Sequence, residues 1–193
     1  EERARVVREQ LQPIGPRPSS EEELSVRVHS RDRIVASMDS SNPIVRNAAA
    51  RVAAGEQGTF SVEQVAAVWS HVRGQWRYVN DPQGSEYFAH ASETIDNDFV
   101  GDCDDFAIVV ASMITAIGGR TRLVMMNGPE GGHAYPEVCL DAEAEDVRAR
   151  LDTHYRALRD PELRQRVNGI HFRPASDCQL WLNLDWNAGV PGG

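Results

Sequence analysis

One cysteine has neighbours of the type and spacing that favour a reactive thiol. Cys103 lies in the run GDCDDF (residues 101–106), which precedes an apolar stretch and a pair of glycines. Since Asp102 is a favourable N-cap and paired glycines commonly end helices, the pattern predicts a buried helix with Cys103 in its first turn. The positive end of the helix dipole favours a thiolate there, and the three flanking carboxylates oppose it. A reactive Cys103 therefore requires a nearby histidine.

Two later segments supply a candidate base and a candidate orienting carboxylate. His133 opens the segment GGHAYPEVCL (residues 131–140), which is typical of a strand. The run LWLNLDW (residues 180–186) alternates strictly, with leucines on one face and Asp185 on the other, and predicts a second strand. A nucleophile, a base and an orienting carboxylate thus follow one another along the chain. The remaining histidines lie in no comparable motif: His29, His71, His90, His154 and His171.

The segments GDCDDFA, GGHAYPEV and LWLNLDW, in this order, resemble the transglutaminase-like superfamily over roughly residues 61–190. The resemblance implies an α+β, papain-like fold, with N-terminal helices, a central Cys-bearing helix and an antiparallel sheet. It implies a Cys-His-Asp triad formed by Cys103, His133 and Asp185. In such proteins the residues before the cysteine motif pass close to the active site. Here that segment contains four polar side chains: Tyr87, His90, Glu93 and Asn97.

The resemblance implies a cysteine-dependent acyl-transfer enzyme that acts on a peptide or carboxamide bond. Bacterial members are more often proteases or amidases than crosslinking enzymes, so hydrolysis is preferred to transglutaminase-type amine transfer. A non-catalytic binding module on the same fold remains an alternative. An arylamine acetyltransferase is disfavoured because the RGGxC context of that family is absent. The backbone N–H of Cys103 is one expected oxyanion donor, and the candidates for a second are Asn97, Tyr87 and Trp76.

Composition limits the class of partner. The 193 residues are 41% hydrophobic and carry a net charge of -9, which fits a folded domain and excludes a general nucleic-acid backbone binder. No stretch approaches the roughly 20 apolar residues of a membrane span. We therefore expect a protein or peptide substrate, no nucleic acid, no membrane span and a cytoplasmic location, unless a leader preceding Glu1 has been removed. The sequence leaves the oligomeric state open.

No cofactor or metal site is predicted. Clustered carboxylates suit calcium, but the three aspartates beside Cys103 lack the ligand spacing of an EF-hand loop, and helix capping explains them. A zinc site is disfavoured because no CxxC pair is present. Cys139 and Cys178 either pair and leave Cys103 free, or remain two buried thiols. We favour the unpaired thiols, because three cysteines do not form a disulfide framework.

Two parts are predicted along the chain. Residues 1–60 form an N-terminal helical extension, with helices starting near Ser20 and at Pro43, and residues 61–193 form the catalytic domain. Ser61 opens the first helix of that domain with the pattern of a capping box. These helices carry no residues that suggest chemistry before position 60.

Two features lie around the histidine strand. Pro136 within the strand predicts an edge position or a bulge, because proline cannot donate to a sheet ladder. The charged segment 141–178 is interpreted as an insertion beside the cleft, with at least one helix outside the sheet that forms a wall or lid. Its deletion is expected to leave the domain folded.

Overall fold

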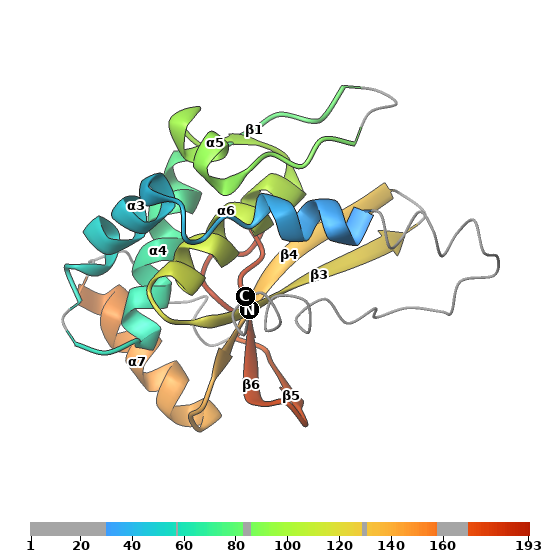
Figure 1. The fold of residues 1–193 in the computed structure, drawn as a ribbon. Helices are drawn as coiled ribbons and strands as arrows, with labels where there is room; N and C mark the ends of the chain where they lie inside the picture. The colour runs from blue at the N-terminus through green and yellow to red at the C-terminus, as the bar shows by residue number, and fades with distance from the viewer. Residues whose placement is uncertain (1–29, 57, 83–85, 129–130, 158–169) are drawn as a thin grey trace.

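The computed structural model describes the following ranges of the chain: 30–56, 58–82, 86–128, 131–157 and 170–193. In this part of the protein, helices lie on one side of an antiparallel sheet (Figure 1). The predicted α+β class with an antiparallel sheet is therefore confirmed. Residues 30–37 are helical, whereas the predicted helix start near Ser20 lies outside the described residues.

Helices α3 (Pro43–Ala53) and α4 (Val62–Gln75) begin where the sequence predicts them. The Asn42 side chain accepts a hydrogen bond from a backbone N–H in the first turn of α3. Ser61 and Gln64 form the predicted capping box at α4. These bonds satisfy N–H groups that have no partner within the helix, so the start of each helix is encoded locally. The apolar face of α4 is buried through four residues: Val65, Val68, Trp69 and Val72.

Helix α6 (Cys103–Ala116) is the predicted Cys-bearing helix, and it contacts both the sheet and the other helices. Residues 106–114 are buried because the sequence there is apolar, apart from one serine. Asp102 caps the helix and forms a capping box with Asp105. Gly118 follows the last turn at a φ of 99°, a left-handed conformation that glycine adopts without strain. The predicted cap and stop of this helix are both present.

A small parallel sheet lies beside the start of α6. Strand β1 (Arg77–Tyr78) pairs with β2 (Val100–Gly101), and Tyr78 lies opposite Gly101 in the register. The short helix α5 (Ala91–Asp96) lies between them in the chain. This pairing brings the end of α4 next to the entry of the Cys-bearing helix.

The larger sheet has the strand order β3-β4-β6-β5, and each neighbouring pair is antiparallel. Its strands have the following bounds: β3 Arg120–Gly128, β4 Gly131–Leu140, β5 Phe172–Ala175 and β6 Cys178–Asn183. Pro136 lies in β4 opposite Leu123 of β3, in a register without a bulge, whereas β6 pairs with β4 only from Glu137 onward. Pro136 therefore lies where the other side of β4 becomes an edge, which agrees with the edge position that the sequence predicts. Proline is tolerated at this position because the regular pairing of β4 with β6 ends at the neighbouring residue, Glu137.

Helix α7 (Ala144–Ala157) begins the segment predicted to be an insertion, and it lies outside the sheet. It packs on α4, where the hydroxyls of Tyr155 and Ser70 lie 3.3 Å apart. In Figure 1, α7 lies at the opposite end of the protein from α5 and β1, so this helix forms no wall beside the cysteine motif. Val147, Leu151 and Tyr155 are buried in the same core as α6. Deletion of the segment should therefore unfold the domain, contrary to the expectation from sequence.

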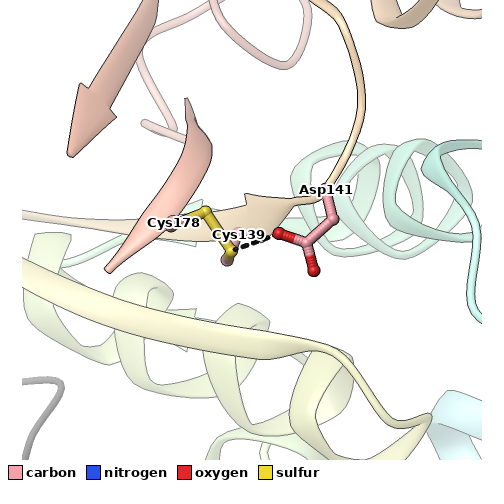
Figure 2. Close-up of side chains that lie close together, drawn as sticks. All are labelled: Cys139, Asp141 and Cys178. Carbon is pink, nitrogen blue, oxygen red and sulfur yellow. Dashed lines mark hydrogen bonds between the residues drawn. A yellow bond between two sulfur atoms is a disulfide. The ribbon is translucent and has the colours of Figure 1, made fainter. Parts of the chain in front are cut away.

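Cys139 and Cys178 form a disulfide that joins β4 to β6 (Figure 2). The favoured interpretation of two unpaired thiols is wrong, and Cys103 is the free cysteine of the three. The antiparallel register brings the two Cα atoms to 5.9 Å, within the range that a disulfide bridges. A sequence separation of 39 residues gave no indication of this register.

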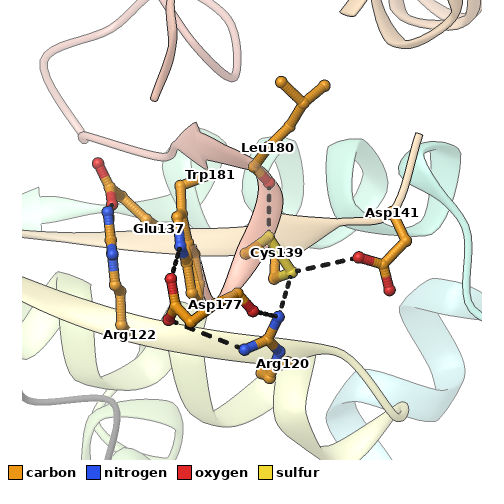
Figure 3. Close-up of a disulfide and its surroundings, with 9 residues drawn as sticks. Arg120, Arg122, Glu137, Cys139, Asp141, Asp177, Leu180 and Trp181 are labelled. Atoms are coloured by element: carbon orange, nitrogen blue, oxygen red, sulfur yellow. Dashed lines mark hydrogen bonds and ion pairs between the residues drawn. A yellow bond between two sulfur atoms is a disulfide. The ribbon is translucent and has the colours of Figure 1, made fainter. Parts of the chain in front are cut away.

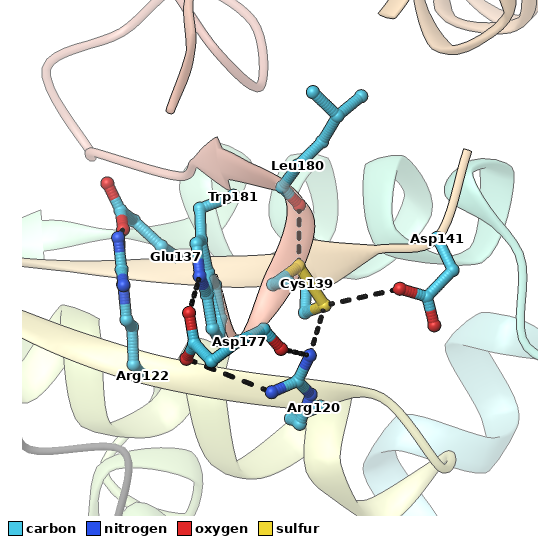
Figure 4. Close-up of polar contacts among 9 residues, drawn as sticks. Arg120, Arg122, Glu137, Cys139, Asp141, Asp177, Leu180 and Trp181 are labelled. Atoms are coloured by element: carbon cyan, nitrogen blue, oxygen red, sulfur yellow. Dashed lines mark hydrogen bonds and ion pairs between the residues drawn. A yellow bond between two sulfur atoms is a disulfide. The ribbon is translucent and has the colours of Figure 1, made fainter. Parts of the chain in front are cut away.

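Charged and aromatic side chains surround the disulfide (Figure 3). The guanidinium groups of Arg122 and Arg120 lie 4.2 and 5.2 Å from the centre of the Trp181 ring. Arg122 Nε donates to the buried carboxylate of Glu137 at 2.6 Å, and Trp181 Nε1 donates to Asp177 at 3.2 Å (Figure 4). The buried charge of Glu137 is thereby paired, as burial requires. Among the described residues, no helix is both long and apolar enough to cross a membrane.

Candidate active site

Cys103 is the first residue of α6 and is half-buried. The backbone N–H of Ala134 faces its sulfur and acts to lower the pKa of the thiol. Ala134 directly follows His133 on β4. The packing of α6 against the sheet therefore brings the thiol next to the strand that carries the candidate base.

His133 and Asp185 are in contact. Nε2 of the imidazole lies 2.6 Å from Oδ2 of the carboxylate, and both side chains are partly buried. Asp185 also accepts the backbone N–H of Asn187 through Oδ1 at 3.0 Å, and its own N–H donates to the Asn183 side chain at 2.6 Å. Because Nε2 is engaged with the carboxylate, Nδ1 is the ring nitrogen left for another partner.

Two residues of the GDCDD motif shape the entry to the helix. Asp105 accepts the N–H of Ala89 at 2.9 Å and that of Asp102 at 3.3 Å, which ties the segment before the motif to α6. A Cβ on residue 101 would lie 2.6 Å from the Cβ of Asp105, so only glycine fits there. Gly101 thus permits the close approach on which the Asp105 bonds depend.

The structure places an aromatic pair, which the sequence did not predict, beside the candidate active site. The Tyr78 ring lies 4.8 Å from the ring of Trp186, the residue after Asp185. Burial raises the pKa of Tyr78, and the negative charge of the Cys103 thiolate raises it further, so the two side chains are near neighbours. No local signal in the sequence could have found Tyr78, because its position follows from the pairing of β1 with β2.

The three candidates for a second oxyanion donor differ in their surroundings. The Tyr87 hydroxyl donates to Glu93 at 2.8 Å and is already engaged. Asn97 is exposed at the end of α5. The Trp76 indole packs edge-on against Phe106 with ring centres 5.1 Å apart, and its buried Nε1 has no hydrogen-bond partner among the described residues. Trp76 is therefore the candidate with an available donor.

Burial raises the pKa of the Cys103 thiol above its ordinary value, and the charges of Asp102 and Asp104 add to this effect. The N–H of Ala134 opposes them. The sequence led us to expect a thiolate favoured by the helix dipole and an imidazolium. Burial of the start of α6 acts in the opposite direction and raises the pKa of this thiol.

The neighbouring carboxyl groups are perturbed in the same way. Burial, followed by the charge of Asp102, raises the pKa of Asp104 to about 9. Burial also raises the pKa of Asp105 to about 6, against the effect of the Ala89 N–H. One carboxylate oxygen from each of the three aspartates lies within 4.8 Å of the other two. Backbone N–H groups occupy both oxygens of Asp105 and one of Asp102; the bonds between Asp105 and Asp102 and between Asp102 and Asp104 are helix-capping bonds.

The raised pKa of Asp104 predicts a pH dependence of stability. The folded state holds this proton to a higher pH than the unfolded state, so the stabilisation is present near pH 4 and is lost as the pH rises toward 9. In the wild-type protein the unfolding free energy should therefore fall as the pH rises. Asp104→Asn should make this slope shallower by at most about 1.4 kcal/mol per pH unit. Urea unfolding of both proteins at pH 5 to 8 measures the difference. Asp96 is exposed, so the control Asp96→Asn should keep the wild-type slope of unfolding free energy against pH. A wild-type slope in Asp104→Asn would contradict the prediction.

Comparison with known proteins places the chain in a family. The sequence profile described as the transglutaminase-like superfamily matches residues 46–151, which include Cys103 and His133. The chain belongs to the transglutaminase-like superfamily. Asp185 lies outside the matched range, so its assignment depends on the contact with His133. Membership in this superfamily supports a cysteine enzyme as the general kind, on a papain-like core.

One solved structure with detectable likeness is a candidate cysteine protease from Cytophaga hutchinsonii. The alignment covers 56% of this chain and 38% of that protein, with 17% identity and a TM-score of 0.43. At these values the likeness assigns neither fold nor function. No protein of curated function matches the sequence.

Proposed function

We propose that this transglutaminase-like protein is a cysteine-dependent acyl-transfer enzyme that hydrolyses a peptide or carboxamide bond. Cys103 is the nucleophile, His133 the base and Asp185 the orienting carboxylate. The observation that supports these roles is the 2.6 Å contact between His133 and Asp185, with the Cys103 sulfur against the N–H of the next residue on the strand, Ala134. The expected substrate is a protein or peptide.

The proton route in the proposal follows from the geometry. Asp185 accepts a hydrogen bond from the Nε2–H of His133, so Nδ1 takes the proton of the Cys103 thiol. Since burial raises the pKa of the thiol, the proposal has this proton transfer accompany the attack of sulfur on the substrate carbonyl carbon. The imidazolium then protonates the leaving amine as the carbon–nitrogen bond breaks. Water attacks the resulting thioester, releases the acid and restores the thiol.

The oxyanion of the tetrahedral intermediate needs hydrogen-bond donors. In the proposal, the backbone N–H of Cys103 is one, because it lies in the first turn of α6 and has no partner within the helix. We propose the Trp76 indole as the second donor, since its Nε1 is buried beside Phe106, one turn after Cys103.

Hydrolysis is preferred to amine transfer because water reaches a thioester without a dedicated site, whereas an amine must outcompete it. The chain contains no lysine, so it offers no side-chain amine for its own crosslinking in either case. The disulfide is informative about the cellular compartment of the protein, because disulfides are rare in the cytoplasm. It favours an oxidising compartment over the cytoplasmic location expected from sequence.

Intact-mass spectrometry during turnover tests the proposal. Glutamine-containing peptides are incubated with the protein, with and without a labelled primary amine. We expect an acyl adduct on Cys103, absent in Cys103→Ala, and release of the free acid in the presence of the amine. Release of the amine conjugate would instead establish transfer. A folded wild-type protein that forms no adduct with any peptide, yet binds peptides equally well with and without Cys103, would establish the binding module.

A further inference from the structure

Helix α4 reaches the backbone on both sides of Asp185. Trp69 Nε1 donates to the carbonyl oxygen of Leu184 at 3.0 Å. Arg73 Nε donates to the carbonyl oxygen of Trp186 at 2.6 Å. The two donors are four residues apart, so they project from one face of the helix. Their acceptors belong to the residues immediately before and after the candidate orienting carboxylate.

The Trp69 bond replaces a bond that the sheet cannot make. Leu184 donates its N–H to the carbonyl of Pro136 at 2.9 Å. Facing residues of such an antiparallel pair normally exchange two bonds, but Pro136 has no N–H to return. The Leu184 carbonyl therefore loses its strand partner, and Trp69 supplies the donor. At this point the chain keeps one hydrogen bond to β4, from the Leu184 N–H, and α4 supplies the second, to the Leu184 carbonyl.

Arg73 makes two contacts with the residue on the other side of Asp185. Besides the carbonyl bond, its guanidinium lies 5.7 Å from the centre of the Trp186 ring. A charged donor makes a stronger hydrogen bond than a neutral one, and the ring contact orients the same side chain. Trp69 is 3% exposed, so it is itself held rigidly by the core.

The remaining bonds of Asp185 to the backbone are local. They join it to Asn183 and Asn187, within the same turn. Such bonds fix the shape of the turn but not its position relative to β4, where His133 lies. Contacts with other elements fix that position: Leu184 donates its N–H to Pro136 of β4, and Trp69 and Arg73 hold the backbone on both sides of Asp185 from α4.

We propose that Trp69 and Arg73, here called the α4 clamp, are positioning residues that hold Asp185 against Nε2 of His133. The clamp acts through Asp185 and touches no reacting atom. The kinetic part of this inference rests on the proposed function, whereas the structural part does not. A displacement of the carboxylate by even about 1 Å is expected to cost up to 100-fold in rate.

Arg73→Met and Trp69→Phe test the clamp, since each removes a donor and keeps most of the side-chain volume. We expect kcat toward a peptide amide to fall roughly 10- to 100-fold, with KM nearly unchanged, because substrate contacts are retained. Matched controls make similar contacts elsewhere. Trp181→Phe removes a buried indole bond, and Arg148→Met removes a carbonyl bond and a ring contact to Phe172. Both controls should keep the wild-type kcat.

A double-mutant cycle separates positioning from a general loss of structure. If the clamp acts through Asp185, Arg73→Met should cost nothing further in an Asp185→Ala background. The same fold loss in both backgrounds would overturn the proposal. Trp69 is part of the core, so if Trp69→Phe fails to fold, the partly exposed Arg73 carries the test alone.

A readout independent of turnover distinguishes failure of the clamp from failure of the proposed function. The Nε2 proton of His133, in its short bond to Asp185, should give a low-field proton NMR resonance. We expect this signal to be lost in Asp185→Ala and weakened in Arg73→Met, and retained in both controls. An unchanged signal in Arg73→Met would refute the clamp, even if the wild-type protein hydrolyses no peptide tested.

Discussion

Cys103→Ala should lower turnover of a peptide amide by at least about 1,000-fold, because no other described side chain at the site offers a comparable nucleophile. His133→Ala should be nearly as severe, since the thiol pKa is raised by burial and the proton must be removed during attack. Asp185→Asn should cost less, roughly 100-fold, because nucleophile and base remain while the imidazole loses its anionic partner. The kcat of each variant on one substrate gives the ranking.

The control for this series is Asp152→Asn, which removes a carboxylate from an exposed pair with Arg156 on α7 and should keep the wild-type rate. All variants should unfold at similar urea concentrations, so that a rate loss reports chemistry. The assignment of Asp185 fails if Asp185→Asn retains full turnover. The assignment of Cys103 as the nucleophile fails if Cys103→Ala remains active in preparations that are free of contaminating wild-type protein.

Removal of the Cys139–Cys178 disulfide should destabilise the fold by about 4 kcal/mol, the entropic effect of opening a loop whose ends are 39 positions apart. The double variant Cys139→Ala/Cys178→Ala, in a Cys103→Ala background that prevents thiol exchange, measures this by urea unfolding. The domain should still fold, because α7 within that loop keeps its buried contacts through Val147 and Leu151.

Reduction provides the matching measurement. A thiol reductant should lower the unfolding midpoint of the Cys103→Ala parent to nearly that of the triple variant, and should leave the triple variant unchanged. A parent whose midpoint does not respond to reductant, and that contains two free thiols by titration, would show that the bond does not form in solution. It would also remove the support for an oxidising compartment.

Features determined within a few residues were predictable from the sequence. The capping bonds of Asp102 and Ser61 join residues two or three positions apart, so residue type alone indicates where α6 and α4 begin. The same is true of the glycine stop after α6 and of the alternation in β6. The sequence also named Cys103, His133 and Asp185 as candidates, and their roles remain predictions.

Features that depend on sheet register or on packing between distant segments were decided only by the tertiary structure. Trp69 and Leu184 are 115 positions apart, and their bond exists because Pro136 cannot complete the ladder beside it. The same lack of local information explains why the sequence left Cys139 and Cys178 unpaired and did not anticipate that burial raises the pKa of the Cys103 thiol. Burial, strand register and the distance between charges are properties of the packed chain, and no short run of residues encodes them.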